Sequence, residues 1–350
     1  KHILEICEGE LINGNTELIC ENFCQDSRLV KKGDTYLGIK GERFNGSEFY
    51  EQAIKNGARI CILQDVEIDK NVIENHPDVA IVLVKDVIKA IQQLAKFKRE
   101  QYNIPVVAIT GSVGKTSTKD IVASVLSTKY NVLKTEGNLN NHIGLPLTIL
   151  KLKNHDAMVV EMGMNHLGEI SVLTNIAKPT VAIITNVGTS HIGNLGTREN
   201  ILKAKLEILE GLEPNGTIII NNDNDLLHGW YLSKQTQNII TYGIENNSDV
   251  IAKDIKLIGE KSIFSAYTNN KQFEIEVPVG GTHFIYNSLC AVSVGNLFEI
   301  SEQKISQAIQ EFELSKNRME VKKVDGVTII NDCYNANPVS MKASLDVLAT

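Results

Sequence analysis

The sequence predicts a multidomain α/β protein with a mainly parallel central sheet, and three observations lead to that prediction. The chain has 350 residues, which exceeds the usual size of one compact domain. In its middle part, unbroken apolar runs typical of strands buried on both faces alternate with stretches of helical periodicity. A new strand and helix begin near residue 327, shortly before the last residue, Thr350. We therefore expect three domains, at residues 1–84, 85–316 and 317–350, with the third incomplete.

The first domain is predicted to be a small α/β unit. Short apolar runs at Thr35–Ile39 and Ala58–Leu63 are separated by Gly, Asn and Asp turns, with a helical pattern at Glu48–Asn56. Apolar residues recur at helical spacing from Val87 to Tyr102, which predicts a connecting helix that Pro105 ends.

The central domain is predicted from four apolar strands, and a fifth strand opens the last domain. The central four are Val106–Thr110, Ala157–Glu161, Val181–Asn186 and Thr217–Asn221. A helical pattern at Lys115–Ser127 follows the first of them. The last domain is expected to start with a strand at Val327–Asn331 and a helix from Val339. Alternation of strands and helices favours a parallel sheet with helices on both faces.

Composition excludes several classes of protein. A net charge of −7 argues against a surface for nucleic acid or anionic membranes, because both require a basic field. The sequence contains no run of 18 apolar residues, and Lys1–Glu5 lacks the features of a signal peptide. The six cysteines include no Cys-x-x-Cys pair, so we expect reduced thiols. These features predict a cytoplasmic protein without membrane insertion, which we expect to be a monomer.

A glycine-rich loop lies between the strand Val106–Thr110 and the helix Lys115–Ser127. Glycines let backbone N–H groups wrap around phosphates, and the start of a helix adds positive potential. A lysine after the second glycine can reach the β- and γ-phosphates, and the hydroxyl that follows can ligate Mg²⁺. The full Walker pattern has glycine at position 109, where this chain has Ile109. We expect ATP to bind at Gly111, Ser112, Val113, Gly114, Lys115, Thr116 and Ser117.

Two further residues are expected at the same edge of the sheet. Glu161 ends one strand and His191 follows another, and ligands of such sheets bind at the carboxyl ends of the strands. A carboxylate there can hold the Mg²⁺ that bridges nucleotide phosphates. Each residue alone also fits a solvated carboxylate or a histidine that satisfies a loop. Lys205, by its position in a helical pattern alone, is expected at the surface.

Three parts of the sequence resemble the Mur ligases of bacterial peptidoglycan synthesis. They are residues 110–119, residues 137–146 together with 161–165, and residues 331–338. The first is similar to the phosphate loop that Mur ligases share with folylpolyglutamate synthetases. The other two are most similar to the branch of the family that adds D-alanyl-D-alanine. The resemblance covers the whole chain. It implies a small N-terminal domain that binds a UDP-sugar, a central P-loop domain and a Rossmann-like C-terminal domain, which here is truncated.

The resemblance also implies roles for individual residues. Lys205, in an Ala-Lys-x-Glu segment, matches a lysine that CO₂ converts to a carbamate. The implied catalytic residues are Lys115, Lys205, His191 and Glu161, and the implied metal site comprises Thr116, Glu161, His191 and Lys205. Asn287, in a His-x-x-x-Asn segment, matches an adenine-binding position, and Asp332 matches a ribose-binding carboxylate. Arg318 lies in a segment that resembles the part of the family that holds adenine and phosphates, and Asn335 matches the adenine-side loop.

The UDP-sugar is implied to bind near the start of the chain. The matching residues are Ser27, Arg28, Arg43, Phe44, Asn45 and Gly46, and Asn138 and Asn141 match substrate positions of the central domain. The family usually has an Asp-Gly-His-Asp type of sequence where this chain has Asn-Gly-Ser-Glu at residues 45–48. Individual contacts to the uridine therefore differ from the family pattern.

The implied activity is an ATP-dependent, ADP-forming ligation of D-alanyl-D-alanine to UDP-N-acetylmuramoyl-tripeptide through an acyl phosphate, with Mg²⁺. With a truncated third domain, we expect ligation to be lost before binding of the UDP-substrate. Another Mur ligase or a folylpolyglutamate synthetase would share the phosphate loop and Lys205 but differ at residues 138–146 and 334–338. A nucleotide-binding partner without catalysis would not need Lys205. A switch GTPase is disfavoured because the sequence has no Asn-Lys-x-Asp segment.

Overall fold

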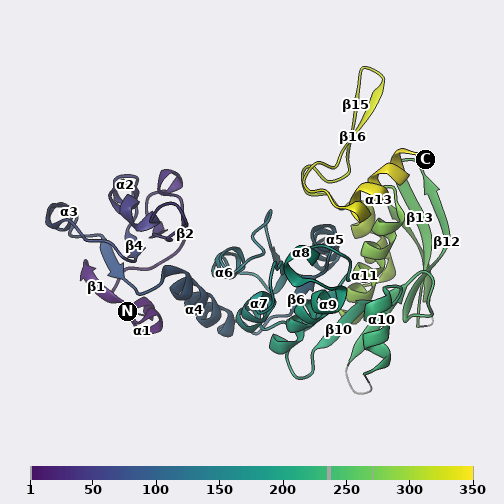
Figure 1. Ribbon diagram of the computed structural model, residues 1–350, viewed down its shortest axis with the longest axis horizontal. Helices are drawn as coiled ribbons and strands as arrows, with labels where there is room; N and C mark the ends of the chain where they lie inside the picture. Colours follow the sequence, from purple (N-terminus) through teal and green to yellow (C-terminus); the bar gives the residue numbers. More distant parts are fainter. Residues whose placement is uncertain (1, 235–237, 270, 350) are drawn as a thin grey trace. The chain divides into compact units, whose positions relative to one another are not determined.

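The structure is a computed structural model that describes residues 2–234, 238–269 and 271–349, and these residues form two compact units (Figure 1). The first unit contains residues 1–103 and 142–153, and the second contains residues 104–141 and 154–350. The helix that we expected to open the second domain, α4 (Val87–Glu100), thus belongs to the first unit. Within the described ranges, no helix is both long and apolar enough to cross a lipid bilayer.

The first unit is a small α/β fold. Its sheet has the order β1 (Glu10–Asn13), β5 (Ala80–Leu83), β4 (Ile60–Leu63), β3 (Thr35–Leu37) and β2 (Phe23–Cys24). Neighbouring strands are parallel except β1, which runs antiparallel to β5. The helices are α1 (His2–Cys7), α2 (Tyr50–Lys55), α3 (Lys70–Asn75), α4 and α6 (Gly144–Leu150), with short 3₁₀ turns η1 (Ser27–Leu29) and η2 (Gly46–Phe49).

Helix α4 shows why the sequence folds this way locally. Asp86 caps its first turn by accepting a hydrogen bond from the Lys89 N–H at 3.0 Å. Its buried side chains recur at helical spacing, and α4 packs against α1 and α6 in this unit. The helix ends at Glu100, two residues before the predicted end, and Pro105 prevents its continuation.

The second unit is built on a large, mainly parallel sheet. In the described residues its strand order is β14 (Lys271–Val277), β13 (Lys261–Thr268), β12 (Val250–Ile258), β11 (Ile239–Gly243), β10 (Thr217–Asn221), β9 (Val181–Ile184), β6 (Val106–Thr110), β8 (Ala157–Glu161) and β7 (Val132–Lys134). The pairs from β7 to β12 are parallel, whereas β12, β13 and β14 are joined antiparallel. Three of the four predicted central strands match to the residue.

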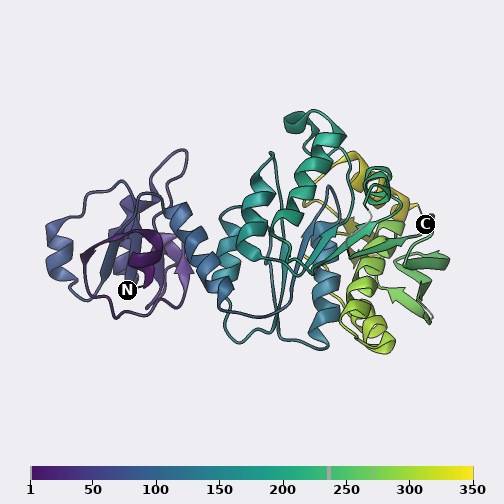
Figure 2. The same cartoon turned by 90° about the horizontal axis from the view of Figure 1, so that it is seen from below.

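Helices cover both faces of this sheet (Figure 2). They are α5 (Lys115–Ser127), α7 (Glu169–Ala177), α8 (Ile192–Leu195), α9 (Arg198–Leu206), the 3₁₀ turn η3 (Glu207–Gly211), α10 (Asp225–Leu232), α11 (Thr282–Leu297) and α12 (Glu302–Gln310). Helices α5 and α11 pack on each other and share one hydrophobic core with alternate residues of β6, such as Val107 and Ile109. The alternation follows from the two-residue period of a strand.

Strand β6 is the point where the strand order reverses. After β6 the chain adds β8 and β7 on one side, and then returns to place β9 and β10 on the other side. Such a reversal opens a crevice at the carboxyl ends of the strands, which is where ligands of open α/β sheets bind. Thr110, Glu161 and Ile184 therefore end their strands beside one another, with Thr110 paired to Ile184 in the register of β6 and β9.

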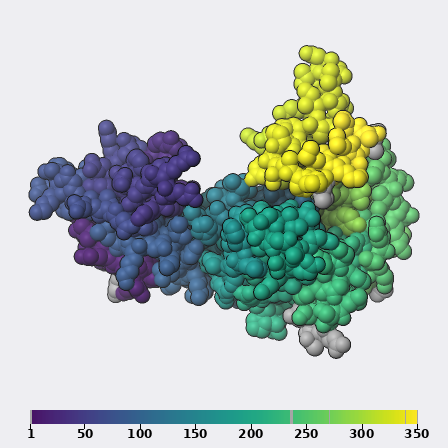
Figure 3. All heavy atoms as spheres, in the orientation of Figure 1, coloured from purple at the N-terminus to yellow at the C-terminus, as the bar shows by residue number. Residues whose placement is uncertain are grey.

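The C-terminal segment contains the predicted strand and helix, but a strand that was not predicted, β15 (Glu320–Val324), precedes them. Strands β15 and β16 (Val327–Asn331) form an antiparallel hairpin, and α13 (Pro338–Leu348) follows. In the space-filling view this segment is the yellow mass that lies on the green and teal parts of the same unit (Figure 3).

Candidate active site

The phosphate loop needs its glycines for space and for backbone conformation. A Cβ atom on Gly111 would collide with the Thr185 hydroxyl. Gly114 has a φ of 79°, a left-handed conformation that side chains disfavour, and helix α5 begins at the next residue, Lys115. The loop is therefore closely packed on the end of β9, and its backbone N–H groups precede the start of a 13-residue helix.

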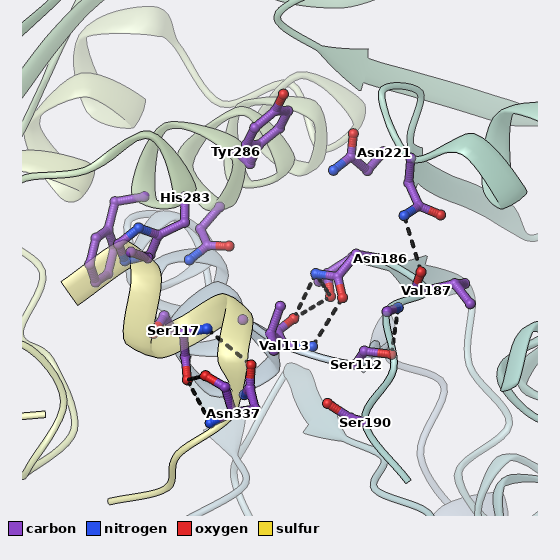
Figure 4. Close-up of a pocket in the computed structure, with 18 of the residues that line it drawn as sticks. Ser112, Val113, Ser117, Asn186, Val187, Ser190, Asn221, His283, Tyr286 and Asn337 are labelled. Carbon is purple, nitrogen blue, oxygen red and sulfur yellow. Dashed lines mark hydrogen bonds between the residues drawn. The ribbon is translucent and has the colours of Figure 1, made fainter. Parts of the chain in front are cut away.

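A side-chain amide that follows β9 holds this loop in shape. The Asn186 side chain accepts a hydrogen bond from the Val113 N–H at 3.0 Å and donates one to the Val113 carbonyl at 2.9 Å (Figure 4). The Ser112 N–H donates to the Asn186 carbonyl at 3.0 Å, and the Ser112 hydroxyl accepts from the Gly188 N–H at 2.9 Å. The apolar pattern placed Asn186 at the end of a predicted strand, without a role in the site. Its place at the carboxyl end of a buried apolar run was the available signal.

Lys115 and Thr116 lie at the start of α5 beside the predicted carboxylate. Lys115 donates from Nζ to the Gly111 carbonyl at 2.9 Å. Burial lowers the pKa of Lys115, the Glu161 carboxylate opposes this, and the Arg318 charge adds to it. The Thr116 hydroxyl donates to Glu161 Oε2 at 2.8 Å, and Asn140 Nδ2 donates to Glu161 Oε1 at 2.7 Å. Each oxygen of this 2% exposed carboxylate is therefore hydrogen-bonded.

The donor set around Glu161 suits a hard cation that shares its ligands with phosphates. In the described residues no group of three or more His, Cys, Asp and Glu side chains is arranged to hold a metal ion. Mg²⁺ usually takes one or two protein ligands and completes its octahedron with water and substrate phosphates. The Thr116 hydroxyl and the Glu161 carboxylate, which lie within hydrogen-bond distance of each other, provide such a pair.

Two further predicted residues, His191 and Lys205, lie where the charge of Lys115 acts on them. His191 lines a cavity beside the phosphate loop and has a left-handed φ of 65°, which is rare outside glycine. Burial, followed by the charges of Lys115 and Lys205, lowers its pKa. Lys205, in α9, is only 1% exposed, so the helical pattern that suggested a surface lysine was misleading. Burial and then the Lys115 charge hold the pKa of Lys205 well below that of an ordinary lysine.

Two cavities meet at the phosphate loop. One, of about 450 Å³, lies between the loop, α11 and the C-terminal segment (Figure 4). The other, of about 360 Å³, lies on the Glu161 side. Ser112, Val113 and Gly114 line both cavities, and Ser117 lines the first. The predicted residues that line the second are Lys115, Thr116, Glu161, His191, Asn138, Asn141, Arg318, Asp332 and Asn335.

The first cavity presents an unpaired donor. Asn287 is buried, and its Oδ1 accepts a hydrogen bond from the Thr118 hydroxyl at 3.0 Å. Among the described residues its Nδ2 atom has no partner, although Asn287 lines the cavity. His283 lines the same wall, and burial lowers its pKa to about 4, so the ring is neutral near pH 7. An unpaired buried amide is costly unless a ligand completes it, so this wall fits a ligand with a hydrogen-bond acceptor.

The C-terminal segment contributes directly to the second cavity. Arg318 donates from Nη2 to the Thr116 hydroxyl at 3.1 Å, and its guanidinium lies 4.2 Å from the centre of the Tyr334 ring. Asp332 lies beside it, accepting from the Met319 N–H at 3.2 Å and from the Ser344 hydroxyl. The C-terminal segment therefore places a cation on the side chain that would ligate Mg²⁺.

The residues near the start of the chain that are implied to bind the UDP-sugar lie in the first unit. Some of them shape the backbone, and the others are exposed to solvent. Ser27 is buried, and Asn45 and Gly46 shape the turn that leads into η2. Arg28 and Phe44 are open to solvent. The Arg28 side chain is 83% exposed, and the residue Phe44 is 62% exposed. Arg28 pairs with Asp26 at 2.7 Å, and Arg43 lies exposed beside Phe44.

Comparisons with known proteins bear on these assignments. The model of the Mur ligase middle domain matches residues 109–295, and that of the Mur ligase family catalytic domain matches residues 22–99. The UDP-N-acetylmuramoyl-tripeptide–D-alanyl-D-alanine ligase of Bacillus subtilis is 40% identical over 99% of this chain and 74% of its own length. This chain belongs to the Mur ligase family. The Escherichia coli protein of the same name is 32% identical to this Mur ligase over 99% of this chain and 75% of its own.

Solved structures agree with the fold of this Mur ligase. A MurF crystal structure from Acinetobacter baumannii superposes with a TM-score of 0.91 at 32% identity, covering 99% of this chain and 75% of its own. MurF ligase from Thermotoga maritima, solved in complex with ADP, gives a TM-score of 0.83 at 29% identity, covering 96% and 76%. The expected α/β fold with a mainly parallel central sheet and the three-domain Mur ligase architecture is thereby confirmed.

Proposed function

We propose that this Mur ligase joins D-alanyl-D-alanine to UDP-N-acetylmuramoyl-tripeptide at the expense of ATP, in the cytoplasmic synthesis of a peptidoglycan precursor. The relatives from B. subtilis and E. coli carry the name of that activity. The observation in the chain itself that carries the proposal is the phosphate loop with Thr116 hydrogen-bonded to the buried Glu161. We further propose that the chain acts as a monomer.

The reaction requires an activated carboxylate, because a carboxylate does not acylate an amine near neutral pH. In the proposed first step, a carboxylate oxygen of the tripeptide attacks the γ-phosphorus of ATP. The bond from that phosphorus to the bridging oxygen breaks, and ADP leaves. The amine of the dipeptide then attacks the acyl carbon, the bond from this carbon to the phosphate oxygen breaks, and phosphate leaves with loss of one proton from nitrogen. The enzyme forms no covalent intermediate.

The chain contributes charge and position to the phosphoryl transfer. Lys115 and the backbone N–H groups of the loop are proposed to hold the nucleotide phosphates, with Arg318 on the side of the reacting group. Thr116 and Glu161 would hold Mg²⁺, which when bound neutralises charge on the phosphates. Because these side chains are already fixed by hydrogen bonds, little reorganisation is needed when ATP binds.

The first cavity is proposed to hold the nucleoside of ATP. Asn287 Nδ2, which has no partner in the described part of the chain, would donate to a ring nitrogen of adenine. The His283 ring, neutral near pH 7, provides a flat wall beside it. Asp332 and Asn335 are proposed to contact the ribose and the phosphate side. Gly111, Ser112, Val113, Gly114 and Ser117 would line the path of the phosphates.

Lys205 is proposed to carry a carbamate. Its lowered pKa leaves a larger fraction of the amine neutral, and the neutral amine attacks CO₂, forming an N–C bond with loss of one proton. The Lys115 charge acts on both His191 and Lys205, so the modification would place an anion near that charge. A carbamate there would help Glu161 and His191 to position Mg²⁺.

The UDP-substrate is proposed to use the exposed residues of the first unit. Arg28, Arg43 and Phe44 offer charge and an aromatic face, whereas Ser27, Asn45 and Gly46 shape the turns that present them. Asn138 and Asn141, in the second cavity, are proposed to contact the peptide end of that substrate.

A substrate panel tests the proposal. Phosphate release from ATP is measured with UDP-N-acetylmuramoyl-tripeptide and either D-alanyl-D-alanine, a single amino acid or no acceptor, and products are weighed by mass spectrometry. The expected product is the UDP-muramoyl-pentapeptide, formed only with the dipeptide. A product with a single amino acid would assign the chain to another branch of the family. Absence of ATP binding by calorimetry would contradict the proposed site itself.

A further inference from the structure

A buried ionic cluster lies one helical turn beyond the phosphate loop. We call it the Asp120 cluster, and it consists of Lys119, Asp120, Lys134, Thr135 and Ser315. Asp120 Oδ1 accepts from Lys119 Nζ at 2.9 Å and from Lys134 Nζ at 3.0 Å. Asp120 Oδ2 accepts from the Ser315 hydroxyl at 2.6 Å. Lys119 Nζ also donates to the Thr135 carbonyl at 2.9 Å.

The centre of the cluster is out of contact with water. The side chains of Lys119 and Asp120 are 2% and 3% exposed, whereas that of Lys134 is 45% exposed. Burial raises the pKa of Asp120, but Lys119, the Ser315 hydroxyl and Lys134 together hold it below its usual value. Buried ion pairs often contribute little net stability, because desolvation offsets their attraction. Stability alone is therefore a weak reason for this arrangement.

The cluster connects three parts of the proposed nucleotide site. Asp120 follows Thr116 by four residues and so lies on the same face of α5. The Glu161 N–H donates to the Thr135 hydroxyl at 3.0 Å, which ties the strand end that carries the carboxylate to the cluster. Ser315 precedes Arg318 by three residues, and Arg318 donates to the Thr116 hydroxyl. The segment from residue 315 to 318 therefore contacts α5 at two points one turn apart.

We propose that Asp120 is a positioning residue: by holding Ser315 against α5, it keeps the Arg318 guanidinium on the Thr116 hydroxyl at the nucleotide phosphates. In the described residues the cluster lines neither cavity, so it acts through Arg318 and not by touching a ligand. The inference rests on the proposed function, because it assigns Arg318 to the phosphates of ATP.

Ser315→Ala is the variant that tests the anchor. It removes one hydroxyl donor and leaves Asp120 with both lysines, whereas Asp120→Asn would leave Lys119 buried without its counter-charge and risk misfolding. Ser315→Thr keeps the hydroxyl and serves as the conservative variant. Ser124→Ala is the matched control, because Ser124 is a half-buried serine of α5 whose hydroxyl donates to the Ala308 carbonyl at 2.9 Å, away from the site.

The first measurement is amide hydrogen exchange without nucleotide. Ser315→Ala is expected to raise exchange at residues 314–320 at least about threefold, and Ser315→Thr and Ser124→Ala are expected to leave these amides near the wild-type rate. Equal protection of this segment in Ser315→Ala and in the wild type would overturn the anchor, whether or not the chain binds ATP.

The second measurement is a double-mutant cycle with Arg318→Ala. Binding of the non-hydrolysable analogue adenylyl imidodiphosphate with Mg²⁺ is followed by calorimetry. Ser315→Ala is expected to weaken binding about three- to tenfold in the wild-type background, but less than about 1.5-fold when Arg318 is alanine. The same loss in both backgrounds would show a general structural effect and overturn the proposal. If the wild-type chain binds no analogue, the proposed function fails, and the exchange data alone decide whether Ser315 is anchored.

Discussion

The nucleotide site of the second unit and the candidate sugar-nucleotide residues of the first unit are built in opposite ways. Glu161 and Lys205 are 2% and 1% exposed, and Glu161 is held by hydrogen bonds on both oxygens. Phe44 is 62% exposed, and Arg28 makes its ion pair with Asp26, two residues away. The charges proposed to act on a phosphoryl group are preorganised and shielded from water, and electrostatic interactions are stronger in such surroundings. The residues proposed to recognise a large substrate lie on an exposed surface.

The largest expected effect sharpens this contrast at Lys115. Lys115→Met should reduce ligation and affinity for ATP by about 10²-fold or more, because it removes a partly buried charge that is proposed to hold the phosphates. Phosphate-release kinetics and calorimetry with Mg²⁺ and ATP measure the two effects. Lys129→Met is the control, since Lys129 follows the end of the same helix and donates to the Phe298 carbonyl. A loss smaller than about threefold would contradict the role of Lys115.

Lys205 is expected to combine loss of activity with a gain of stability. Lys205→Met should lower ligation about 10²-fold, and a ¹³C NMR signal from labelled bicarbonate should appear in the wild type and be absent in the variant. Because the folded pKa lies below that of an unfolded lysine, the unfolded chain binds more protons, and the wild type gains stability as pH rises.

In CO₂-free buffer near pH 7, Lys205→Met should therefore raise the unfolding temperature by a few degrees, and the difference should shrink as the pH approaches about 10.4. Lys203→Met, an exposed neighbour in α9, should change neither property. A destabilised Lys205→Met variant would show that an interaction of the buried amine stabilises the fold by more than the desolvation of the amine costs.

Phe44 is expected to produce a moderate and selective effect. Phe44→Ala should weaken binding of UDP-N-acetylmuramoyl-tripeptide about three- to tenfold. An exposed aromatic ring offers a surface for stacking, but no network of hydrogen bonds holds it in place. Calorimetry with that substrate measures the change. Phe97→Ala, which removes another partly exposed ring of the same unit, is the control. Equal losses in both variants would remove Phe44 from the binding surface.

The last expected effect concerns stability and pH at His283, and it leaves ligand affinity aside. Its folded pKa of about 4 lies below the ordinary value of 6.5, so the unfolded chain binds more protons between these values. Stability from this group is present above pH 6.5 and is lost as pH falls through 4, by about 3 kcal/mol at most. Denaturant unfolding at several pH values should show this loss in the wild type and its absence in His283→Gln. Parallel curves would contradict the buried, neutral ring.

The same contrast explains how far the sequence could predict the molecule. Strands β6, β8 and β10 and helix α5 were predicted to the residue, because buried apolar runs and a glycine-rich loop leave few alternatives. The strand predicted at Val181–Asn186 ends at Ile184 instead, because Thr185 and Asn186 turn their side chains to the phosphate loop. Such long-range hydrogen bonds have no periodicity that a sequence pattern can reveal.

Lys205 and Asp120 show the same limit. Both lie in helical patterns with charged neighbours, and periodicity alone would place them at the surface, but the fold buries them. The resemblance to Mur ligases reversed the prediction for Lys205, whereas Asp120 had no such support. The exposed residues of the first unit were named through resemblance alone, and their roles stay predictions.

The most direct test of the account compares two ligands on two variants. Affinities for Mg²⁺-ADP and for UDP-N-acetylmuramoyl-tripeptide are measured by calorimetry on Lys115→Met and Phe44→Ala. Lys115→Met is expected to lose affinity for the nucleotide and to keep its affinity for the UDP-substrate, and Phe44→Ala is expected to do the reverse. If either variant weakens both ligands equally, or if the two losses are exchanged, the division between a buried phosphate site and an open substrate surface is contradicted.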